Sequence, residues 1–348
     1  MATPHPIGTI HTAEYHTAGE PFRIVTDGAP ETEGATVLDR RSWAQEHLDE
    51  VRAFLVNEPR GHADMYGGFV TPPDDGDGDL GVIFFHKDGF STACGHGTIA
   101  LATWAIDSGR IEPGEDRSVE MVIDVPSGRL RVVAELDERR RVNSVRFWNV
   151  DSFVTAQQLP VETDRGALTV DVSFGGAFYG SVPLDDPALG LTPDRAHLGR
   201  LIDLAGQIKA RFQGHDAVTH PDPRLSGMYG VIFHRDMPPS SAEGDPPPAL
   251  QQRNVTVFAD GEVDRSPCGS GTSARLAVLQ AQGRLDVGDV FVNEGVAGGR
   301  FGAGIEDLRN EDDRALVATW VTGSAYTTGT ATFVLDERDP IGVGFQLR

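Results

Sequence analysis

The amino-acid sequence predicts an α/β protein made of two similar domains, in each of which a mixed sheet wraps around a central apolar helix. Three observations lead to this prediction: a long segment repeats at half the chain length, its second part has the pattern of a buried helix, and short strand patterns flank both copies. The chain has 348 residues and 39 % hydrophobic content, which is enough for two buried cores.

The repeat begins at the two cysteines of the chain. "CGHGTIALATWAIDSGRI", from Cys94, matches "CGSGTSARLAVLQAQGRL", from Cys268, in its cysteine, glycines, threonine and closing Gly-Arg. A helix-stopping glycine follows at the same step in both copies, at Gly109 and Gly283. Agreement through a whole helix indicates duplication into two domains with one thiol each. The alternative is a chance likeness of two glycine-rich turns.

The central helix of each copy is predicted to be enclosed. Residues 99–106 are apolar on nearly every side, so no face of this helix suits water. Surface helices are expected at residues 41–54 and 193–212, and mobile surface loops rich in Pro, Gly and Asp at residues 71–79 and 237–252. The surrounding strands are predicted by β-branched or alternating runs between glycines and prolines: "LGVIFFH", "VRFWNVDSFV", "LTVDVSFGGAFYG", "RNVTVFADG", "ALVATWVTG" and "TATFVL".

Composition excludes several classes of protein. The 52 acidic residues exceed the 30 Lys and Arg residues and give a formal charge of -22, which repels nucleic acid and anionic membranes. The N-terminus lacks the basic and apolar regions of a signal peptide, and no run of 18 apolar residues predicts a membrane span. Two cysteines half a chain apart predict no disulfide framework. We expect a soluble, cytoplasmic protein with no nucleic-acid or membrane partner.

Each cysteine is followed by glycines that allow a tight turn and leave backbone N–H groups unblocked. A helix N-terminus carries orphan N–H donors and partial positive charge, so it binds a carboxylate and lowers the pKa of a cysteine placed there. Each copy therefore predicts a readily ionised thiol beside a carboxylate site. The glycines are Gly95, Gly97, Gly269 and Gly271.

These two thiols suit one reaction. If the two helix starts face each other, a small amino acid can lie between them with one sulfur on each side of its Cα. One thiolate then removes the α-proton and the opposite thiol delivers a proton, which inverts the carbon. Amides of the Gly-His and Gly-Ser pairs after the cysteines would hold the carboxylate. His96 and Asp264 are the expected partners of the substrate ammonium or of the thiols.

The same residues also have plainer interpretations. A buried cysteine often acts as a small hydrophobic side chain, and His96 could simply cap or pack a helix. Zinc would need further ligands, and no second cysteine or His-x3-His spacing accompanies Cys94. "CGHGT" is not a nucleotide-binding GxGxxG motif. A pyridoxal-phosphate enzyme would need a Schiff-base lysine, and neither Lys87 nor Lys209 lies in a phosphate-binding pattern. We therefore expect no metal and no cofactor.

Five motifs resemble those of the proline racemase family, which includes hydroxyproline epimerases and trans-3-hydroxy-L-proline dehydratases. They are "HTAGEPFRIV", "NEPRGHADMYGG", "CGHGTIAL", "DVSFGGAFYG" and "DRSPCGSGTSA", and the resemblance covers nearly the whole chain. It implies a diaminopimelate-epimerase-like fold of two pseudo-symmetric domains and a homodimer. The first domain is expected at residues 1–155 with a C-terminal segment of about residues 330–348, and the second at residues 156–329.

Carried over position by position, the resemblance implies that Cys94 and Cys268 are the acid–base pair and that Asp264 is the ammonium partner. Tyr66 and Phe258 match positions whose rings wall the pocket, and these two assignments rest on the resemblance alone. The implied carboxylate cradle consists of Gly95, His96, Gly269 and Ser270.

The predicted function is cofactor-independent racemisation or epimerisation of proline or a hydroxyproline, a small-molecule substrate. Cys268 favours it, because the dehydratase branch of the family usually has threonine at this position. Tyr66 and the run around Phe258 look closer to the dehydratases, so a trans-3-hydroxy-L-proline dehydratase is the alternative. A non-catalytic amino-acid-binding protein is a more distant one.

Overall fold

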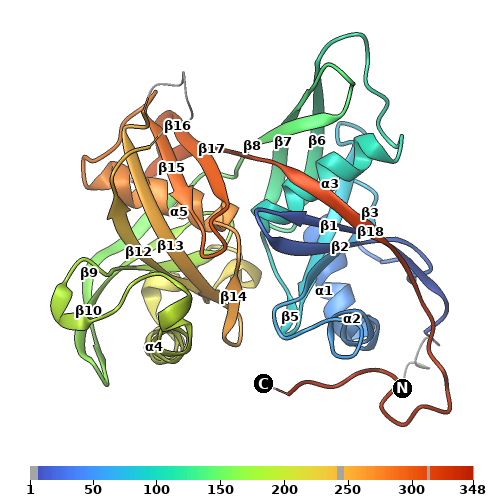
Figure 1. Cartoon of the computed structure of the whole chain (residues 1–348), viewed down its shortest axis with the longest axis horizontal. Helices are drawn as coiled ribbons and strands as arrows, with labels where there is room; N and C mark the ends of the chain where they lie inside the picture. Colours follow the sequence, from blue (N-terminus) through green and yellow to red (C-terminus); the bar gives the residue numbers. More distant parts are fainter. Residues whose placement is uncertain (1–6, 241–246, 312–313, 348) are drawn as a thin grey trace. The chain divides into compact units, whose positions relative to one another are not determined.

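The computed structural model describes residues 7–240, 247–311 and 314–347. Its internal contacts divide the chain into two units (Figure 1). Unit 1 comprises residues 1–145 and 324–348, and unit 2 comprises residues 146–323. The domain limits expected from the sequence fall inside two strands, β9 (Phe153–Thr163) and β18 (Ala325–Phe333).

Unit 1 is built around helix α3 (Gly95–Asp107), which is buried from Gly95 to Ile106. Strand β1 pairs antiparallel with β2 and β18, and β2 continues into a parallel pair with β3. The β3–β4 and β6–β7 pairs are antiparallel, whereas β4 and β6 are parallel. The expected mixed sheet around a central helix is confirmed here, since α3 contacts β1, β2, β7 and β18. The other strands are β1 (Ile10–Thr17), β2 (Glu20–Asp27), β3 (Tyr66–Thr71), β4 (Leu80–His86), β5 (Gly89–Phe90), β6 (Ser118–Val125) and β7 (Gly128–Leu136).

Unit 2 repeats this plan around helix α5 (Gly269–Ala281), which is buried from Gly269 to Leu279. Two parallel pairs, β11–β12 and β13–β15, alternate with antiparallel pairs, so this sheet is also mixed. Helix α5 contacts β9, β10, β11, β16 and β17. Strand β8 (Val142–Trp148) crosses the boundary between the units. The remaining strands are β10 (Gly166–Phe174), β11 (Phe178–Pro183), β12 (Met228–Met237), β13 (Leu250–Phe258), β14 (Glu262–Asp264), β15 (Val290–Glu294), β16 (Arg300–Glu311) and β17 (Arg314–Gly323).

The sequence predicted a single helix at residues 41–54, and this prediction is wrong. The structure has two helices instead, α1 (Val37–His47) and α2 (Asp49–Val56), because the backbone leaves helical geometry at Leu48. The Leu48 side chain is fully buried, so its packing outweighs the helical preference of the run. Helix α1 begins earlier than expected since Thr36 caps it by accepting a hydrogen bond from the Asp39 N–H.

The second surface helix lies close to its expected position. Helix α4 (Leu198–Arg211) follows a short 3₁₀ turn (Arg195–His197), which Asp194 caps. Its buried stripe, from Leu201 to Ile208, packs against β12 and β13. Further 3₁₀ turns are Pro187–Leu189, Asp216–Val218 and Pro223–Leu225.

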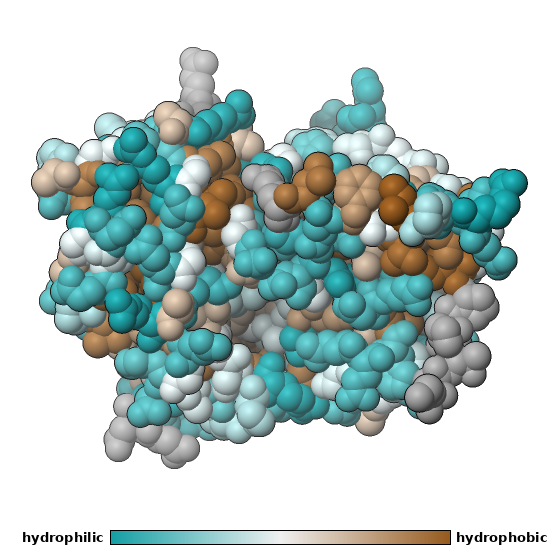
Figure 2. Space-filling view, turned by 90° about the horizontal axis from the view of Figure 1, so that it is seen from below, coloured by the Kyte–Doolittle hydropathy of each residue, from teal (hydrophilic) through white to brown (hydrophobic). Residues whose placement is uncertain are grey.

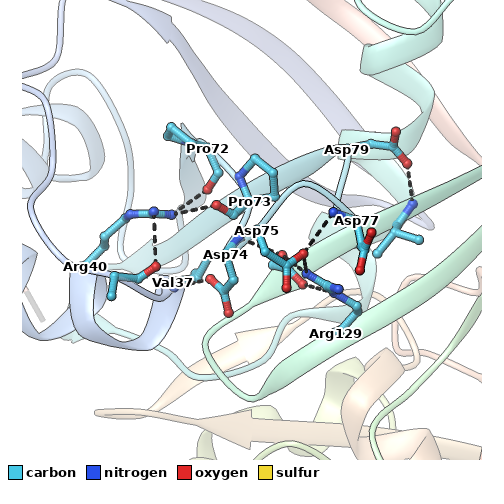
Figure 3. A network of polar contacts seen from close by, with 12 residues as sticks. Val37, Arg40, Pro72, Pro73, Asp74, Asp75, Asp77, Asp79 and Arg129 are labelled. Atoms are coloured by element: carbon cyan, nitrogen blue, oxygen red, sulfur yellow. Dashed lines mark hydrogen bonds and ion pairs between the residues drawn. The ribbon is translucent and has the colours of Figure 1, made fainter.

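The acidic loop at residues 71–79 is held by a network of polar contacts (Figure 3). Arg129 donates hydrogen bonds to Asp75, at 2.7 Å, and to the buried Asp124, at 2.8 and 3.0 Å. Arg40 donates to a proline carbonyl of the loop at 2.5 Å. The arginines therefore counter the loop's negative charge and tie it to unit 1, where the sequence predicted a mobile segment.

The other predicted loop, residues 237–252, lies partly outside the described residues, which omit 241–246. Its last residues, from Leu250, are the start of strand β13.

Hydrophilic residues cover most of the face in Figure 2, which accords with the formal charge of -22. Apolar residues appear there between them. Among the described residues, no helix has the length and hydrophobicity needed to cross a membrane.

The enclosure of α3 gives a direct prediction for stability. Leu101 is 0 % exposed, so Leu101→Ala should lower the free energy of unfolding by about 2–5 kcal/mol, measured by urea denaturation. Leu308→Ala is the matched control, because Leu308 is 38 % exposed and its truncation should change stability by less than about 0.5 kcal/mol. Equal effects of the two substitutions would contradict the central position of α3.

Candidate active site

Cys94 occupies the N-cap position of α3, with extended backbone dihedrals. Its Sγ accepts a hydrogen bond from the Gly97 N–H at 3.3 Å, which satisfies one of the orphan donors of the helix. Gly97 has no space for a side chain, because a Cβ there would lie 2.7 Å from Cys94 Sγ and 2.5 Å from the Phe22 ring. The glycine therefore lets the sulfur approach the helix start. The sequence predicted unblocked N–H groups here, but the Gly97 N–H is bonded to the sulfur.

His96 lies beside this thiol. Its ring nitrogens are 3.5 and 3.6 Å from Cys94 Sγ. Burial lowers the pKa of His96 to about 3, and a hydrogen bond to the Pro21 backbone opposes this effect only in part. The imidazole is therefore neutral at neutral pH and offers a hydrogen bond rather than a charge.

Tyr66 belongs to the same cluster in unit 1. Its ring meets the His96 ring edge-on, with the ring centres 4.9 Å apart. The Tyr66 hydroxyl hydrogen-bonds the Ser91 hydroxyl in the buried interior. The structure thus brings Tyr66, Cys94 and His96 together, with Gly95 between the last two in sequence.

Cys268 precedes α5 as Cys94 precedes α3, but its backbone differs. Its φ of 65° is in the left-handed region, which costs a non-glycine residue about 1–3 kcal/mol. A Cβ on Gly271 would lie 2.9 Å from Cys268 Sγ, so this glycine has the same spacing and the same role as Gly97. Both cysteines are buried, with 6 % of each residue exposed.

Asp264 is the charged neighbour of Cys268. Its carboxylate accepts a hydrogen bond from the Ser266 N–H at 2.8 Å, and Ser266 Oγ accepts one from the Cys268 N–H at 3.1 Å. Burial raises the pKa of Asp264 to about 6. Burial also raises the pKa of the Cys268 thiol, and the nearby Asp264 carboxyl adds to this effect, whereas the Gly271 N–H favours the thiolate.

Ser270 and Phe258 complete the predicted set in unit 2. Ser270 Oγ hydrogen-bonds the Tyr179 hydroxyl at 2.7 Å, and the same hydroxyl is 3.7 Å from Cys268 Sγ. Phe258 stacks on Tyr229, with 5.7 Å between ring centres, and Tyr229 in turn meets Tyr179 edge-on.

The sequence did not assign a role to Tyr179 or Ser266. Both lie in runs that carried the family resemblance, "DVSFGGAFYG" and "DRSPCGSGTSA". Their contacts with the thiol or with its neighbours depend on the folded chain, since Tyr179 and Cys268 are far apart in sequence. Ser266 is closer, and a hydroxyl two residues before a predicted catalytic cysteine is a usable signal.

The described strands belong to one mixed sheet, which in each unit packs around an enclosed helix that follows a cysteine. This arrangement defines a protein of the diaminopimelate-epimerase-like fold class. The family model for proline racemase matches residues 12–346. The chain belongs to the proline racemase family.

Two curated relatives cover nearly the whole chain. A trans-3-hydroxy-L-proline dehydratase of Bacillus cereus is 42 % identical over 97 % of this chain and 97 % of its own length. A 3-hydroxyproline 2-epimerase of Burkholderia multivorans is 40 % identical over 98 % of each chain. The crystal structure of a hydroxyproline epimerase from Agrobacterium vitis, with bound trans-4-hydroxy-L-proline, matches with a TM-score of 0.87 at 31 % identity, over 97 % of this chain and 96 % of that one.

The raised pKa of Asp264 predicts a specific pH dependence of stability. The unfolded chain releases this proton near pH 4 and the folded chain near pH 6, so the contribution of Asp264 to the stability of the wild type is lost as the pH rises from about 4 to about 6. Asp264→Asn keeps an acceptor for the Ser266 N–H but removes the titration. Relative to the wild type, its free energy of unfolding should rise by up to about 3 kcal/mol across this window. Parallel urea-denaturation profiles from pH 4 to pH 7 would contradict the assignment.

The crowding at Gly97 predicts a further effect. Gly97→Ala should displace Phe22 or the Cys94 thiol and lower the free energy of unfolding by about 1–3 kcal/mol in urea denaturation. Gly206→Ala, within α4, is the matched control, because nothing lies within 4 Å of the added Cβ and alanine favours the helix by up to about 1 kcal/mol. A Gly97→Ala protein as stable as the control would show that the sulfur does not need this space.

Proposed function

We propose that this enzyme inverts the α-carbon of 3-hydroxyproline, with Cys94 and Cys268 as paired acid and base and without a cofactor. One observation carries the proposal: in each unit a thiol lies at the start of an enclosed helix, three residues before a glycine that leaves room for the sulfur. The names of two relatives support 3-hydroxyproline as the substrate, because each name refers to 3-hydroxyproline.

In the proposed step, the thiolate of one cysteine takes the α-proton of the substrate. The Cα–H bond breaks, and its electron pair is shared between Cα and the substrate carboxylate. The thiol of the other cysteine then gives its proton to the opposite face of Cα. One proton is taken up and one is delivered, so the step needs no oxidant or reductant. It does require both sulfurs to reach the same carbon.

The substrate's own charges have candidate partners. The amides at the starts of α3 and α5 would bind its carboxylate and stabilise the charge that develops there, since helix N-termini favour anions. Asp264 would pair with the substrate ammonium, which supplies the positive charge that a buried carboxylate needs. His96, which is neutral, would orient Cys94 or the carboxylate through hydrogen bonds. The implied cradle residues are Gly95, His96, Gly269 and Ser270.

Dehydration of trans-3-hydroxy-L-proline is the second candidate, because the relative with 42 % identity carries that name. The same carbanion would form, but the bond between C3 and its oxygen would then break. Hydroxide would leave with a proton from a thiol as water, and the resulting enamine would tautomerise to a cyclic imine. Cys268 supports epimerisation over this route, because it offers a proton donor for the second face of Cα.

Incubation of the purified protein with trans-3-hydroxy-L-proline separates the two reactions. We expect the cis-3-hydroxy-D epimer by chiral chromatography and no cyclic imine in a trapping assay with o-aminobenzaldehyde. L-Proline and trans-4-hydroxy-L-proline, tested alongside, should react more slowly. Imine formation without inversion would replace the epimerase by the dehydratase.

The cysteine variants are the controls for this experiment. Cys94→Ser and Cys268→Ser should each lower epimerisation by at least about a hundredfold, because a serine hydroxyl is too weak an acid to exchange protons as a thiol does. Wild-type turnover in either variant would remove that residue from the acid–base pair.

A further inference from the structure

The two units place different polar groups beside their thiols. Phe22 in β2 and Tyr179 in β11 lie three residues after the turn glycines Gly19 and Gly176, and both are fully buried. Each ring contacts the second residue of the central helix. Phe22 meets the His96 ring edge-on at 5.8 Å, and Tyr179 hydrogen-bonds Ser270.

The neighbouring rings support the equivalence of Phe22 and Tyr179. Tyr66 and Tyr229 come from matching "MYG" runs that lead into strands β3 and β12. Phe22 packs against Tyr66 with 6.3 Å between ring centres, and Tyr179 packs against Tyr229 with 5.9 Å. The two units thus hold the same pair of rings, and they differ by the hydroxyl of Tyr179.

At the second residue of the central helix the difference is reversed, because unit 1 has the polar ring there and unit 2 does not. Unit 1 has an apolar ring on the strand and an imidazole on the helix, with its nitrogens 3.5 and 3.6 Å from Cys94 Sγ. Unit 2 has the small Ser270 on the helix and a phenol on the strand, with its oxygen 3.7 Å from Cys268 Sγ. A polar atom of a ring therefore lies beside each sulfur, but the ring comes from the helix in unit 1 and from the strand in unit 2.

We propose that Tyr179 is a positioning residue for Cys268 and does in unit 2 what His96 does in unit 1. Its hydroxyl donates to Ser270 Oγ while Cys268 carries its proton, and it donates to the sulfur once Cys268 has become a thiolate. This role rests on the proposed function, in which Cys268 alternates between the two states. Each unit thus places one polar ring beside its sulfur. In unit 1 the pair is Phe22 on the strand and His96 on the helix, and in unit 2 it is Tyr179 on the strand and Ser270 on the helix.

The surroundings of Tyr179 keep its hydroxyl protonated, so that it can donate a hydrogen bond to Cys268. Burial holds the pKa of Tyr179 well above its usual value, and Cys268 and Tyr229 add to this effect, so the phenol keeps its proton at neutral pH. The hydroxyl lowers the pKa of the Cys268 thiol, in opposition to burial and to Asp264. Asp264 has no acidic counterpart in unit 1, where Phe90 stands four residues before the cysteine.

Thiol alkylation tests the role of Tyr179 without any substrate. The chain has two cysteines, so in a Cys94→Ser background iodoacetamide reports on Cys268 alone. Adding Tyr179→Phe should move the midpoint of the pH–rate profile upward by about one unit, which is a tenfold change in thiolate fraction. Tyr15→Phe is the matched control, because Tyr15 is also buried and donates its hydroxyl to Asp107, at the opposite end of α3 from Cys94 and in the other unit from Cys268. An unchanged midpoint in a folded Tyr179→Phe protein overturns the proposal, whatever the substrate of the enzyme.

Turnover with 3-hydroxyproline provides the second test. Tyr179→Phe should lower kcat by about ten- to a hundredfold, the range for a lost hydrogen bond to a charged group, whereas Tyr15→Phe should stay within about threefold of the wild type. Tyr179→Phe combined with Ser270→His copies the arrangement of unit 1 and should recover at least about tenfold over the single variant. If the double variant has no higher kcat than Tyr179→Phe, a histidine at position 270 cannot replace the Tyr179 hydroxyl, and the proposed equivalence of His96 and Tyr179 is contradicted.

Discussion

The structure depends on one arrangement, a cysteine at the start of a buried helix that packs against the strands of its unit. The residues of the first turn are buried, so its N–H groups need partners such as the sulfur, side chains or a bound carboxylate. Glycine follows three residues later because a Cβ at Gly97 or Gly271 would lie less than 3 Å from the sulfur before it. The core of each unit and its candidate chemistry are therefore built from the same residues.

The two units surround the thiol with different polar and charged groups. Cys94 has normal extended backbone and a neutral imidazole beside it. Cys268 has a positive φ, a buried carboxyl from Asp264 and the phenol of Tyr179 around it. Both sets of neighbours leave the cysteine buried. The two units share the position of the cysteine before the central helix, whereas the side chains around each sulfur differ.

Much of this arrangement could be predicted from the sequence, because it is encoded locally. The enclosed helices, the cysteines at their starts and the glycines beside them follow from residues next to one another in the chain. The prediction of a single helix at residues 41–54 was wrong, because the break between α1 and α2 at Leu48 depends on packing of that residue in the core of unit 1. The role of Tyr179 was missed for a similar reason. Its partner Ser270 is distant in sequence, and only the folded sheet brings the phenol to the start of α5.

The central claim, that two thiols exchange protons with one carbon, is tested most directly by epimerisation of trans-3-hydroxy-L-proline in D₂O, stopped early and analysed by mass spectrometry of each epimer. A two-thiol mechanism predicts deuterium at Cα of the product epimer and almost none in the recovered substrate, because one cysteine removes the proton and the other delivers the deuteron. Equal early labelling of substrate and product would mean that a single base serves both faces, and it would contradict the account.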